Sequence, residues 1–412
     1  MKDTLKNINI KFLLVVFIAF LLGLQLGRRD VILSWHNYNP ALSIINKEAP
    51  KYFSIDFGLF WRTWDLLSKE YIDKKALDPQ KLFYGAISGM VASLGDPYTV
   101  FLVPEAQKST REDLGGSFDG VGIELGFNPE KRLVVIAPLS KTPADKAGIL
   151  AGDLITKIDS KDTTGMNLPD AVKLIRGLKG TAVNLDILRA GLSEPKTYTL
   201  TRDTIIVKSV EVSFKDTKSR KKVALIKLSR FGERTNDEWN SAVAEILSAK
   251  AQAVILDVRN NPGGFLESAV FIVSEFLDGG DAVLQESNDG VKIPYKVNRA
   301  GKLLNIPLEV LINKGSASAS EIVAGSLQDR KRAVLIGEKS FGKGTIQQAQ
   351  ELENGTGIHI TVAKWLTPNS RWVNELGGLS PDVLVELPKA SEGQPLDSAK
   401  DPQLDKALEL LE

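Results

Sequence analysis

The sequence predicts an α+β protein of several domains, and three observations lead to this prediction. The 412 residues are enough for two or three domains that each have a core. In the second half of the chain, apolar runs typical of strands alternate with helical patterns, as in an α/β sheet. Before that half lies a block of short strands with two short helical stretches, and its size suits one compact domain.

Residues 1–30 carry a targeting pattern. The apolar run FLLVVFIAFLLGLQLG has basic residues on both sides: Lys2, Lys6, Lys11, Arg28 and Arg29. The run is short for a spanning helix, but no small-x-small cleavage site follows it, so a retained signal anchor is favoured over a cleaved signal peptide. The alternative of a buried core helix is disfavoured by the terminal position and the lysines. We expect the rest of the chain in the cell envelope, at the extracytoplasmic face of the inner membrane or in the periplasm.

Residues 31–55 have no clear period and are interpreted as a tether. Residues 56–112 are predicted to be a helical region, with helices near 57–71 and 79–94. The first helix places six apolar residues on one face: Phe57, Phe60, Trp61, Trp64, Leu67 and Tyr71. Such a face needs a partner surface, either the rest of the chain or a second copy of it.

Residues 113–203 form the block of short strands, with helical stretches at 142–147 and 168–176. In this block Gly120, Val121, Gly122 and Ile123 make a loop of small and apolar residues that opens a strand. Such a loop can offer N–H groups to the C-terminal carboxylate of a peptide, and the strand edge can add the peptide as another strand. The short Gly-x-Gly pattern is not specific by itself.

Residues 204–388 are predicted to form an α/β core, followed by a polar tail and a terminal helix at 389–412. The strands VALIKL, AVILDV, PLEVLIN and AVLIG alternate with helices at 236–249, 266–277 and about 318–329. In such a sheet the chemistry is expected where strands end and feed loops and helix N-termini.

The segment GSASASE joins the strand PLEVLIN to the next helix. A serine at a strand-to-helix turn can expose its hydroxyl beside N–H groups that would hold an oxyanion. Spacing alone does not choose among Ser316, Ser318 and Ser320. A capping box of Ser318 with Glu321 explains the pattern without catalysis.

The stretch GEKSFGKGT at 337–345 nearly matches the motif of a phosphate-binding loop. However, Gly344 occupies the position where Ser or Thr must ligate magnesium. The following residues read as two strands around an Asn-Gly turn and not as a helix. A neutral Lys343 beside one of the serines could instead act as a general base, with Gln347 on the same strand face to orient the amine. The alternative is a solvated lysine in a turn.

In DVRNNPGG at 257–264, adjacent glycines follow a buried-looking strand. Glycines allow backbone N–H groups to approach a ligand closely, which suits an oxyanion hole, although a tight turn before a helix explains them nearly as well.

Composition excludes several other classes. Cysteine is absent, and His36 and His359 are the only histidines, so thiolate catalysis and a histidine-dependent metal cluster are not expected. The 52 basic and 51 acidic residues nearly cancel without a basic run, which argues against a nucleic-acid partner. We expect no metal and no cofactor.

Taken together, the motifs resemble those of the C-terminal processing peptidases, or tail-specific proteases, which are serine endopeptidases with an inserted PDZ domain. The resemblance begins near Phe57 and rests on an ordered set: SGMVASLGDPYTVFL, GVGI with AGILAGDLI, VILDVRNNPGG, GSASASEIVAGSLQD, GEKSFGKGTIQ and ITVAKWLTP. It implies that residues 113–203 are a PDZ domain and residues 204–388 a protease core.

The resemblance also implies residue roles. Ser318 would be the nucleophile, Lys343 the base and Gln347 the residue that orients the lysine. The oxyanion donors would be the N–H groups of Gly264 and Ala319, and the carboxylate-facing N–H groups of the PDZ loop would belong to Val121, Gly122 and Ile123.

The expected partners are proteins or peptides with free C-terminal tails, bound through the PDZ domain, which would also gate the site. The membrane and an adaptor protein are further expected partners, and the aromatic helical face would suit a homodimer. His359 is interpreted as a strand surface residue.

Three other classes compete. A chymotrypsin-like protease needs a histidine and an aspartate, and the few histidines argue against it. A penicillin-binding or β-lactamase enzyme needs S-x-x-K with its companion motifs, and the S-x-x-K matches at Ser193 and Ser219 fit only the first part, in loop-like contexts. A catalytically inactive PDZ scaffold would not need both Ser318 and Lys343.

Overall fold

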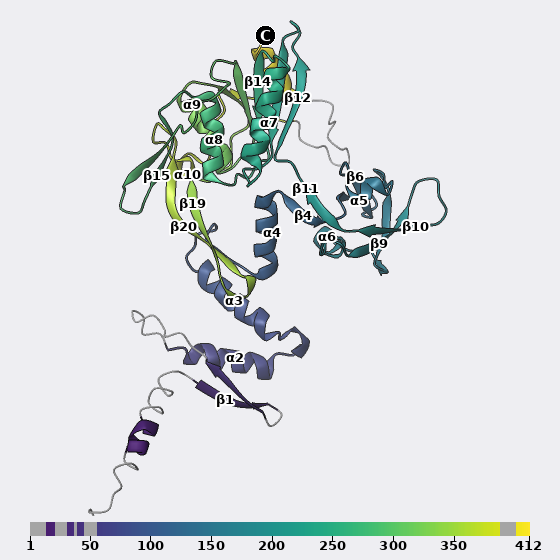
Figure 1. The fold of residues 1–412 in the computed structure, drawn as a ribbon, viewed down its shortest axis with the longest axis vertical. Helices are drawn as coiled ribbons and strands as arrows, with labels where there is room; N and C mark the ends of the chain where they lie inside the picture. The colour runs from purple at the N-terminus through teal and green to yellow at the C-terminus, as the bar shows by residue number, and fades with distance from the viewer. Residues whose placement is uncertain (1–13, 21–30, 37–38, 45–55, 388–400) are drawn as a thin grey trace, which may run out of the picture. The chain divides into compact units, whose positions relative to one another are not determined.

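The computed structural model describes residues 14–20, 31–36, 39–44, 56–387 and 401–412, and the chain divides into two compact units, Met1–Leu82 and Phe83–Glu412 (Figure 1). Of the predicted targeting segment, only residues 14–20 are described, and the predicted polar tail before the terminal helix lies outside the described residues. Within the described ranges, no helix is both long enough and apolar enough to cross a membrane.

The first unit contains a two-stranded antiparallel hairpin, β1 (Val31–His36) and β2 (Asn39–Ile44), and helix α2 (Gly58–Glu70). The hairpin lies within residues 31–55, which were predicted to be a tether, and its two strands were not predicted. β-Branched and aromatic residues in VILSWH favour a strand even without clear alternation. Helix α2 follows its predicted range closely, and none of its residues is buried. Trp61 is 62% exposed, and Phe60 and Trp64 are half-buried.

Between the first helices and the PDZ-like block lie three further elements: α3 (Pro79–Ala92), β3 (Val100–Leu102) and α4 (Pro104–Gly115). Helix α3 confirms the second predicted helix. Helix α4 was not predicted as a separate helix. Pro104 at its first position and Gly116 in the left-handed conformation after its end are ordinary start and stop signals.

Residues 117–206 form the PDZ-like part. Its sheet has the order β10-β9-β7-β6-β5, with β8 beside β7, and β4 pairs with β11 as a separate ribbon. The strands are β4 (Ser117–Gly120), β5 (Ile123–Phe127), β6 (Leu133–Pro138), β7 (Leu154–Ile158), β8 (Lys161–Asp162), β9 (Ala182–Leu188), β10 (Lys196–Thr201) and β11 (Asp203–Ile206). The helices are α5 (Pro143–Lys146) and α6 (Leu168–Ile175), as predicted. Alternating apolar residues of the sheet pack on α6 and form a core separate from that of the α/β part.

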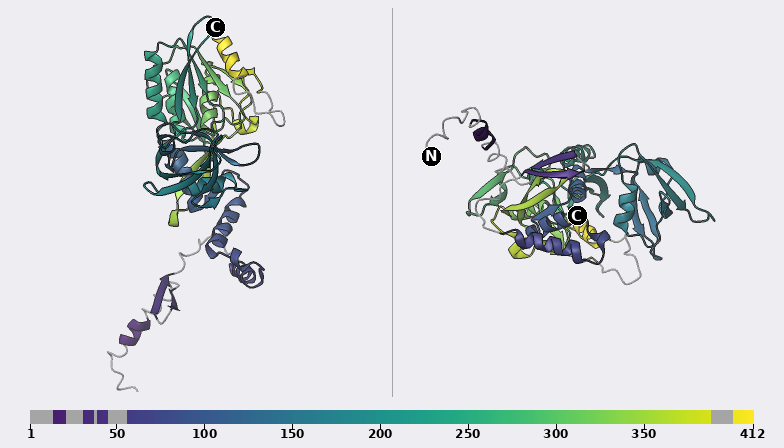
Figure 2. Two further views of the ribbon diagram at one scale, coloured as in Figure 1. Left: turned by 90° about the vertical axis from the view of Figure 1, so that its right-hand side faces the viewer. Right: turned by 90° about the horizontal axis from the view of Figure 1, so that it is seen from below.

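The α/β part is built on a sheet of order β12-β13-β14-β17-β18-β21, parallel from β13 onward. Its strands are β12 (Val210–Asp216), β13 (Lys222–Leu228), β14 (Ala253–Asp257), β17 (Leu308–Ile312), β18 (Val334–Gly337) and β21 (Val383–Leu384). Helices α7 (Thr235–Ser248), α8 (Leu266–Phe276) and α9 (Ala319–Asp329) pack on one face. Helix α11 (Pro402–Leu410) packs on the other, which makes three layers (Figure 2). The strands alternate between the two cores, as Val254 and Ile255 do.

A second, antiparallel sheet has the order β16-β15-β20-β19, with β3 also paired to β20. It comprises β15 (Asp281–Glu286), β16 (Lys292–Lys296), β19 (Thr345–Glu351) and β20 (Gly357–Leu366); the short helix α10 (Val373–Leu376) follows it. Strands β19 and β20 confirm the predicted hairpin, and Asn354 and Gly355 both have positive φ at its turn, 59° and 75°.

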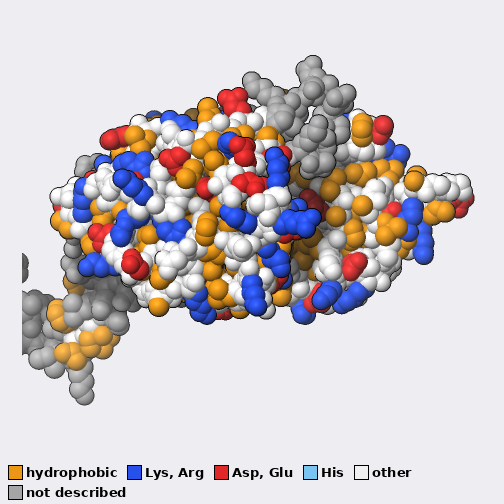
Figure 3. All heavy atoms as spheres, turned by 90° about the horizontal axis from the view of Figure 1, so that it is seen from above, with side chains coloured by type: hydrophobic (Ala, Val, Ile, Leu, Met, Phe, Trp, Pro, Cys, Tyr) orange, Lys and Arg blue, Asp and Glu red, His pale blue; other side chains and the backbone are white. Residues whose placement is uncertain are grey.

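Acidic and basic side chains are interspersed over the face of the molecule shown in Figure 3, which shows no extended basic patch. This agrees with the near-zero net charge.

Candidate active site

Three neighbouring parallel strands bring the predicted catalytic segments to one edge of the sheet. Strand β14 leads into the NPGG loop, β17 into the segment with Ser318, and β18 into the segment with Lys343. The three strands are adjacent and parallel, so their carboxyl ends meet at the same edge. The strand order therefore gathers segments that lie up to 80 residues apart in sequence.

Ser318 is the N-cap of α9 and has an unusual backbone conformation, φ 55° and ψ −115°. A positive φ is costly for a residue with a Cβ and occurs at strained turns that carry function. Ser318 is half-buried between two buried alanines, whereas Ser316 and Ser320 are fully buried. The hydroxyls of Ser316 and Ser320 donate to the carbonyls of Val258 and Asn261 at 2.8 and 2.9 Å. Of the three serines, only Ser318 faces open space.

Glu321 links the segment of Ser318 to the segment of Lys343. Its Oε2 accepts the N–H groups of Ser318 and Lys343, both at 2.9 Å. Its Oε1 accepts the Ser340 hydroxyl at 2.5 Å and the Gly342 N–H at 2.7 Å. Glu321 is fully buried. The acceptor predicted for a capping box is present, and the same carboxylate also fixes the second loop.

The NPGG loop lies directly against the nucleophile turn. The Ala317 N–H donates to the Asn261 carbonyl at 3.0 Å. Gly263 has φ 104°, and a Cβ there would lie 2.8 Å from the Cβ of Ser318, so a larger residue does not fit. Within the described part of the chain, neither the Gly264 N–H nor the Ala319 N–H donates a hydrogen bond. These two N–H groups beside Ser318 are free to hold an oxyanion.

Lys343 is held in a tight passage that explains its flanking glycines. A Cβ at Gly342 would lie 2.8 Å from the Gly378 nitrogen, and one at Gly344 would lie 2.7 Å from the Trp372 ring. The indole of Trp365 donates to the Lys343 carbonyl at 2.9 Å. The side chain is half-buried, and this burial lowers the pKa of Lys343, while the nearby carboxylates of Asp96 and Glu321 oppose the shift.

Gln347 lies in the same cavity but does not make the bond expected of it in this structure. Its amide Nε2 donates to the hydroxyls of Thr345 at 2.9 Å and Thr361 at 3.1 Å. Among the described residues, no hydrogen bond joins Gln347 to Lys343, or Lys343 to the Ser318 hydroxyl. The three side chains are therefore assembled but not hydrogen-bonded to one another. Catalytic hydrogen bonds often tighten only when substrate is bound.

A cavity of about 420 Å³ joins these residues and contains others that sequence reasoning missed. Ser318, Lys343, Gln347 and Gly264 line it, and so do three residues of α4, namely Thr110, Asp113 and Leu114. No local pattern pointed to α4, because it precedes the nucleophile by about 200 residues.

His359 also lines this cavity and is half-buried, a position that its interpretation as a strand surface residue did not predict. Burial and the nearby Lys343 charge lower the pKa of His359. The predicted hairpin contained the missing signal, since it pairs His359 with Ala349 on the strand that carries Gln347.

The predicted peptide-binding residues Val121, Gly122 and Ile123 lie in the PDZ-like part and do not line the catalytic cavity. Gly122 has φ 76°, and Ile123 opens β5, the edge strand of its sheet. Helix α6 contacts β5. A free strand edge beside a helix is the arrangement that accepts an extended peptide as an added strand.

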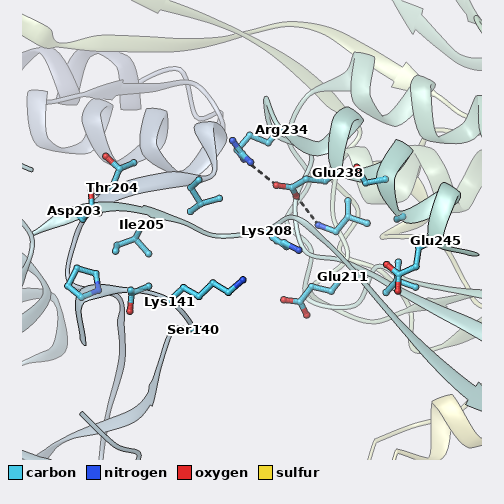
Figure 4. Close-up of a pocket in the computed structure, with 17 residues that line it drawn as sticks. Ser140, Lys141, Asp203, Thr204, Ile205, Lys208, Glu211, Arg234, Glu238 and Glu245 are labelled. Carbon is cyan, nitrogen blue, oxygen red and sulfur yellow. Dashed lines mark hydrogen bonds and ion pairs between the residues drawn. The ribbon is translucent and has the colours of Figure 1, made fainter. Parts of the chain in front are cut away.

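A larger cavity of about 820 Å³ shares no residue with the catalytic one. It is lined by residues of the PDZ-like part, such as Lys141 and Asp203, and of the α/β part, such as Glu211 and Glu238 (Figure 4). Glu238 forms an ion pair with Arg234 and accepts hydrogen bonds from the N–H groups of Ser209 and Val210. Ser209 and Val210 lie in the segment that connects the two parts. The lining contains both acidic and basic side chains, and they surround the segment of chain that joins the PDZ-like part to the α/β part.

Family models match three stretches of the chain: peptidase family S41 at residues 222–385, a PDZ domain at 134–189, and the "activating protease CtpB N-terminal domain" at 45–106. The matched peptidase stretch contains Ser318, Lys343 and the NPGG loop. Fold and site thus define a serine-type peptidase that carries a PDZ domain.

The chain belongs to the C-terminal processing peptidase family. It is 39% identical over 351 residues to the carboxyl-terminal-processing protease of Synechocystis sp. PCC 6803, covering 85% of this chain and 81% of that one. It is 36% identical over 359 residues to the carboxy-terminal processing protease CtpA of Bacillus subtilis 168, covering 87% and 75%. The solved structure of a protein from Bacteroides fragilis NCTC 9343 that carries the S41 protease name shares the fold, with a TM-score of 0.56 and 16% identity. The match covers 88% of this chain and 99% of that one.

Proposed function

We propose that this chain is an endopeptidase with a Ser318–Lys343 dyad. Neutral Lys343 takes the proton of the Ser318 hydroxyl, and the Ser318 oxygen attacks a peptide carbonyl. The N–H groups of Gly264 and Ala319 stabilise the oxyanion, the leaving amine receives the proton, and water then hydrolyses the acyl-enzyme.

One observation carries the proposal: the parallel strands β17 and β18 deliver Ser318 and Lys343 to a single cavity, and the buried Glu321 carboxylate binds the backbone of both. Burial supports the role of Lys343, because it disfavours the ammonium and so makes a neutral amine available.

We further propose that the PDZ domain binds the C-terminal tail of a substrate and gates this site. A tail would add to the β5 edge, with its carboxylate at the N–H groups of Val121, Gly122 and Ile123. Helix α4 connects that groove to the catalytic cavity. Arg176, at the end of α6, forms an ion pair of 3.0 Å with Glu112 on α4, and α4 residues line the cavity.

We place the protein in the cell envelope, associated with the membrane through its first 30 residues, because of their apolar run and flanking basic residues. The exposed aromatic face of α2 supports a homodimer or an adaptor as the partner of this helix.

The test is hydrolysis of an unfolded protein with an apolar C-terminal tail by the full-length chain. Ser318→Ala and Lys343→Ala should each abolish cleavage. Lys343→Arg should do the same, because arginine keeps the charge but cannot act as a base at neutral pH. Lys314→Ala is the matched control, since Lys314 lies on the same loop as Ser318 with its side chain 82% exposed.

Residual cleavage by pure Ser318→Ala would refute the proposed nucleophile. Activity in Lys343→Arg would refute the base. If no variant cleaves, including the wild type, while tail peptides still bind, the chain is a PDZ binding module or requires an activating partner.

A further inference from the structure

The segment Gly95–Thr99 lies beside Lys343, since the Tyr98 ring is close to its amine. Strand β3, which follows it, pairs with the start of β20, with Val100 opposite His359. Because the pairing is antiparallel, the residues before Val100 run on past His359 toward Thr361 and Lys343. Residues far from Lys343 in sequence thus become its neighbours.

Tyr98 presents its ring face to the lysine amine. The Lys343 Nζ lies 4.9 Å from the centroid of the Tyr98 ring, within the range of a cation–π interaction. Tyr98 is half-buried. Within the described part of the chain, Lys343 Nζ donates no hydrogen bond and forms no ion pair. The ring is therefore the contact that restricts where the amine can lie.

Asp96 fixes this segment, and its charge acts on the same amine. Its Oδ1 accepts the Tyr98 N–H at 3.0 Å and its Oδ2 accepts the Thr99 hydroxyl at 2.7 Å. The charge of Asp96 is the largest influence that opposes the burial-induced lowering of the Lys343 pKa.

The segment also reaches Gln347. The hydroxyl of the buried Thr99 accepts the Thr361 N–H at 3.0 Å, and the Thr361 hydroxyl accepts Gln347 Nε2 at 3.1 Å. One short stretch of chain therefore contacts the lysine directly and Gln347 through one residue.

We propose that Tyr98 is a positioning residue for Lys343, holding the amine against its ring face, with Asp96 as the carboxylate that holds Tyr98 in place and whose charge acts on the ammonium formed when Lys343 takes the serine proton. This inference rests on the proposed role of Lys343 as base. When the amine becomes charged in the transition state, the negative ring face and the Asp96 carboxylate stabilise it.

If Tyr98 had only a structural role, its removal would change the pH dependence of the rate in a different way. Among the described residues, the charged or titratable groups around Lys343 are Asp96 and Tyr98 from this segment, Glu321 from α9, His359 from β20, and Asp113, Glu267 and Tyr295 in the cavity wall. Removing a group that stabilises the ammonium lowers the pKa of Lys343. The rate, which rises as Lys343 loses its proton, would then begin to rise at a lower pH. A loss of packing alone would lower the rate without shifting the rising limb of the pH profile.

The experiment measures the pH profile of kcat/KM with the full-length chain and an unfolded protein substrate. Tyr98→Leu, which removes the ring, should lower the plateau about tenfold and move the rising limb about half a pH unit toward acid. Asp96→Asn should move the limb in the same direction. Tyr98→Phe keeps the ring face and should recover most of the activity that Tyr98→Leu loses. Tyr198→Leu is the matched control, because the Tyr198 ring lies 5.0 Å from the Lys196 amine on β10 and does not line the catalytic cavity.

The proposal is overturned if Tyr98→Leu keeps the wild-type plateau and limb, or if Tyr98→Phe is impaired as much as Tyr98→Leu. Melting temperatures of all variants separate misfolding from a local effect, and a folded Asp96→Asn with an unmoved limb also contradicts the role given to Asp96. Lys343→Ala and Ser318→Ala are run alongside. If either one cleaves, the dyad itself is wrong; if both are inactive and Tyr98→Leu behaves as wild type, only the inference about Tyr98 fails.

Discussion

Gly264 has a backbone conformation and a close neighbour that together exclude other residues. Its φ is 139°, and a Cβ there would lie 2.0 Å from the carbonyl oxygen of Phe231. The strand-like bridge between Phe231 and Gly264 holds the loop in this position. The glycine is thus required for the approach of the NPGG loop to Ser318, which a tight turn alone would not require.

We predict that Gly264→Ala lowers kcat at least about 100-fold, because the added methyl group displaces the N–H proposed to hold the oxyanion. The kcat and the melting temperature should be measured together. Gly279→Ala is the control, since a Cβ at Gly279 meets no atom within 4 Å. Wild-type kcat in Gly264→Ala would remove Gly264 from the oxyanion hole.

Helix α11 covers the face of the sheet opposite to α7–α9, and buried charges anchor it. Arg259, five residues before Gly264, forms ion pairs of 2.7 Å with Asp257 and with Asp401 at the start of α11. Beneath the helix, strand β17 carries the buried Glu309, whose Oε2 has no hydrogen-bond partner among the described residues. Burial and then the charge of Asp382 raise the pKa of Glu309 to about 7.

This raised pKa predicts a stability that depends on pH. The folded state favours protonated Glu309, so its stabilising contribution is present below pH 4.5 and is lost as the pH rises through about 7. Relative to the wild type, Glu309→Gln should gain up to about 3 kcal/mol in free energy of unfolding at pH 8 and little below pH 4.5. Urea unfolding at several pH values measures this, with the exposed Glu194→Gln as control. Equal pH dependence in wild type and Glu309→Gln would contradict the assignment.

At the scale of the whole molecule, the PDZ domain and the peptidase part have separate cores but share α4. The helix forms an ion pair with Arg176 of the PDZ domain through Glu112, and it lines the catalytic cavity through Asp113 and Leu114. The surface pair alone contributes little to stability. Under the proposal that the PDZ domain binds a substrate tail, this pair would link the PDZ domain to the cavity through α4.

We predict that a peptide with an apolar C-terminal tail, added in trans, stimulates wild-type cleavage of a short fluorogenic peptide. Gly122→Ala should abolish this stimulation, because the added Cβ would lie 2.4 Å from the side chain of Thr142, the N-cap of α5, and so displace the loop proposed to hold the carboxylate. Gly148→Ala is the matched control: its φ of 77° is equally strained, but no atom lies within 4 Å. Undiminished stimulation in Gly122→Ala would place the tail elsewhere.

The sequence by itself determined strands β13, β14, β17 and β18 with the helices of the main sheet, the β19–β20 hairpin and the short segments that carry Ser318, Lys343 and Gly264. These follow from local causes: apolar periodicity, turn residues and the conformations that glycine permits. Periodicity did not predict the hairpin at residues 31–44, because its strands lack clear alternation. The order of the strands was not readable from the chain either.

Only the tertiary structure decided which loops meet. The order β14-β17-β18 brings three distant loops together, and the pairing of β3 with β20 adds Tyr98 and Asp96. It also places His359 and α4 in the cavity, and it leaves Gln347 hydrogen-bonded to two threonines. The physical reason is that local sequence sets backbone preference, whereas contacts between distant segments depend on how the sheets and helices bury their apolar faces together.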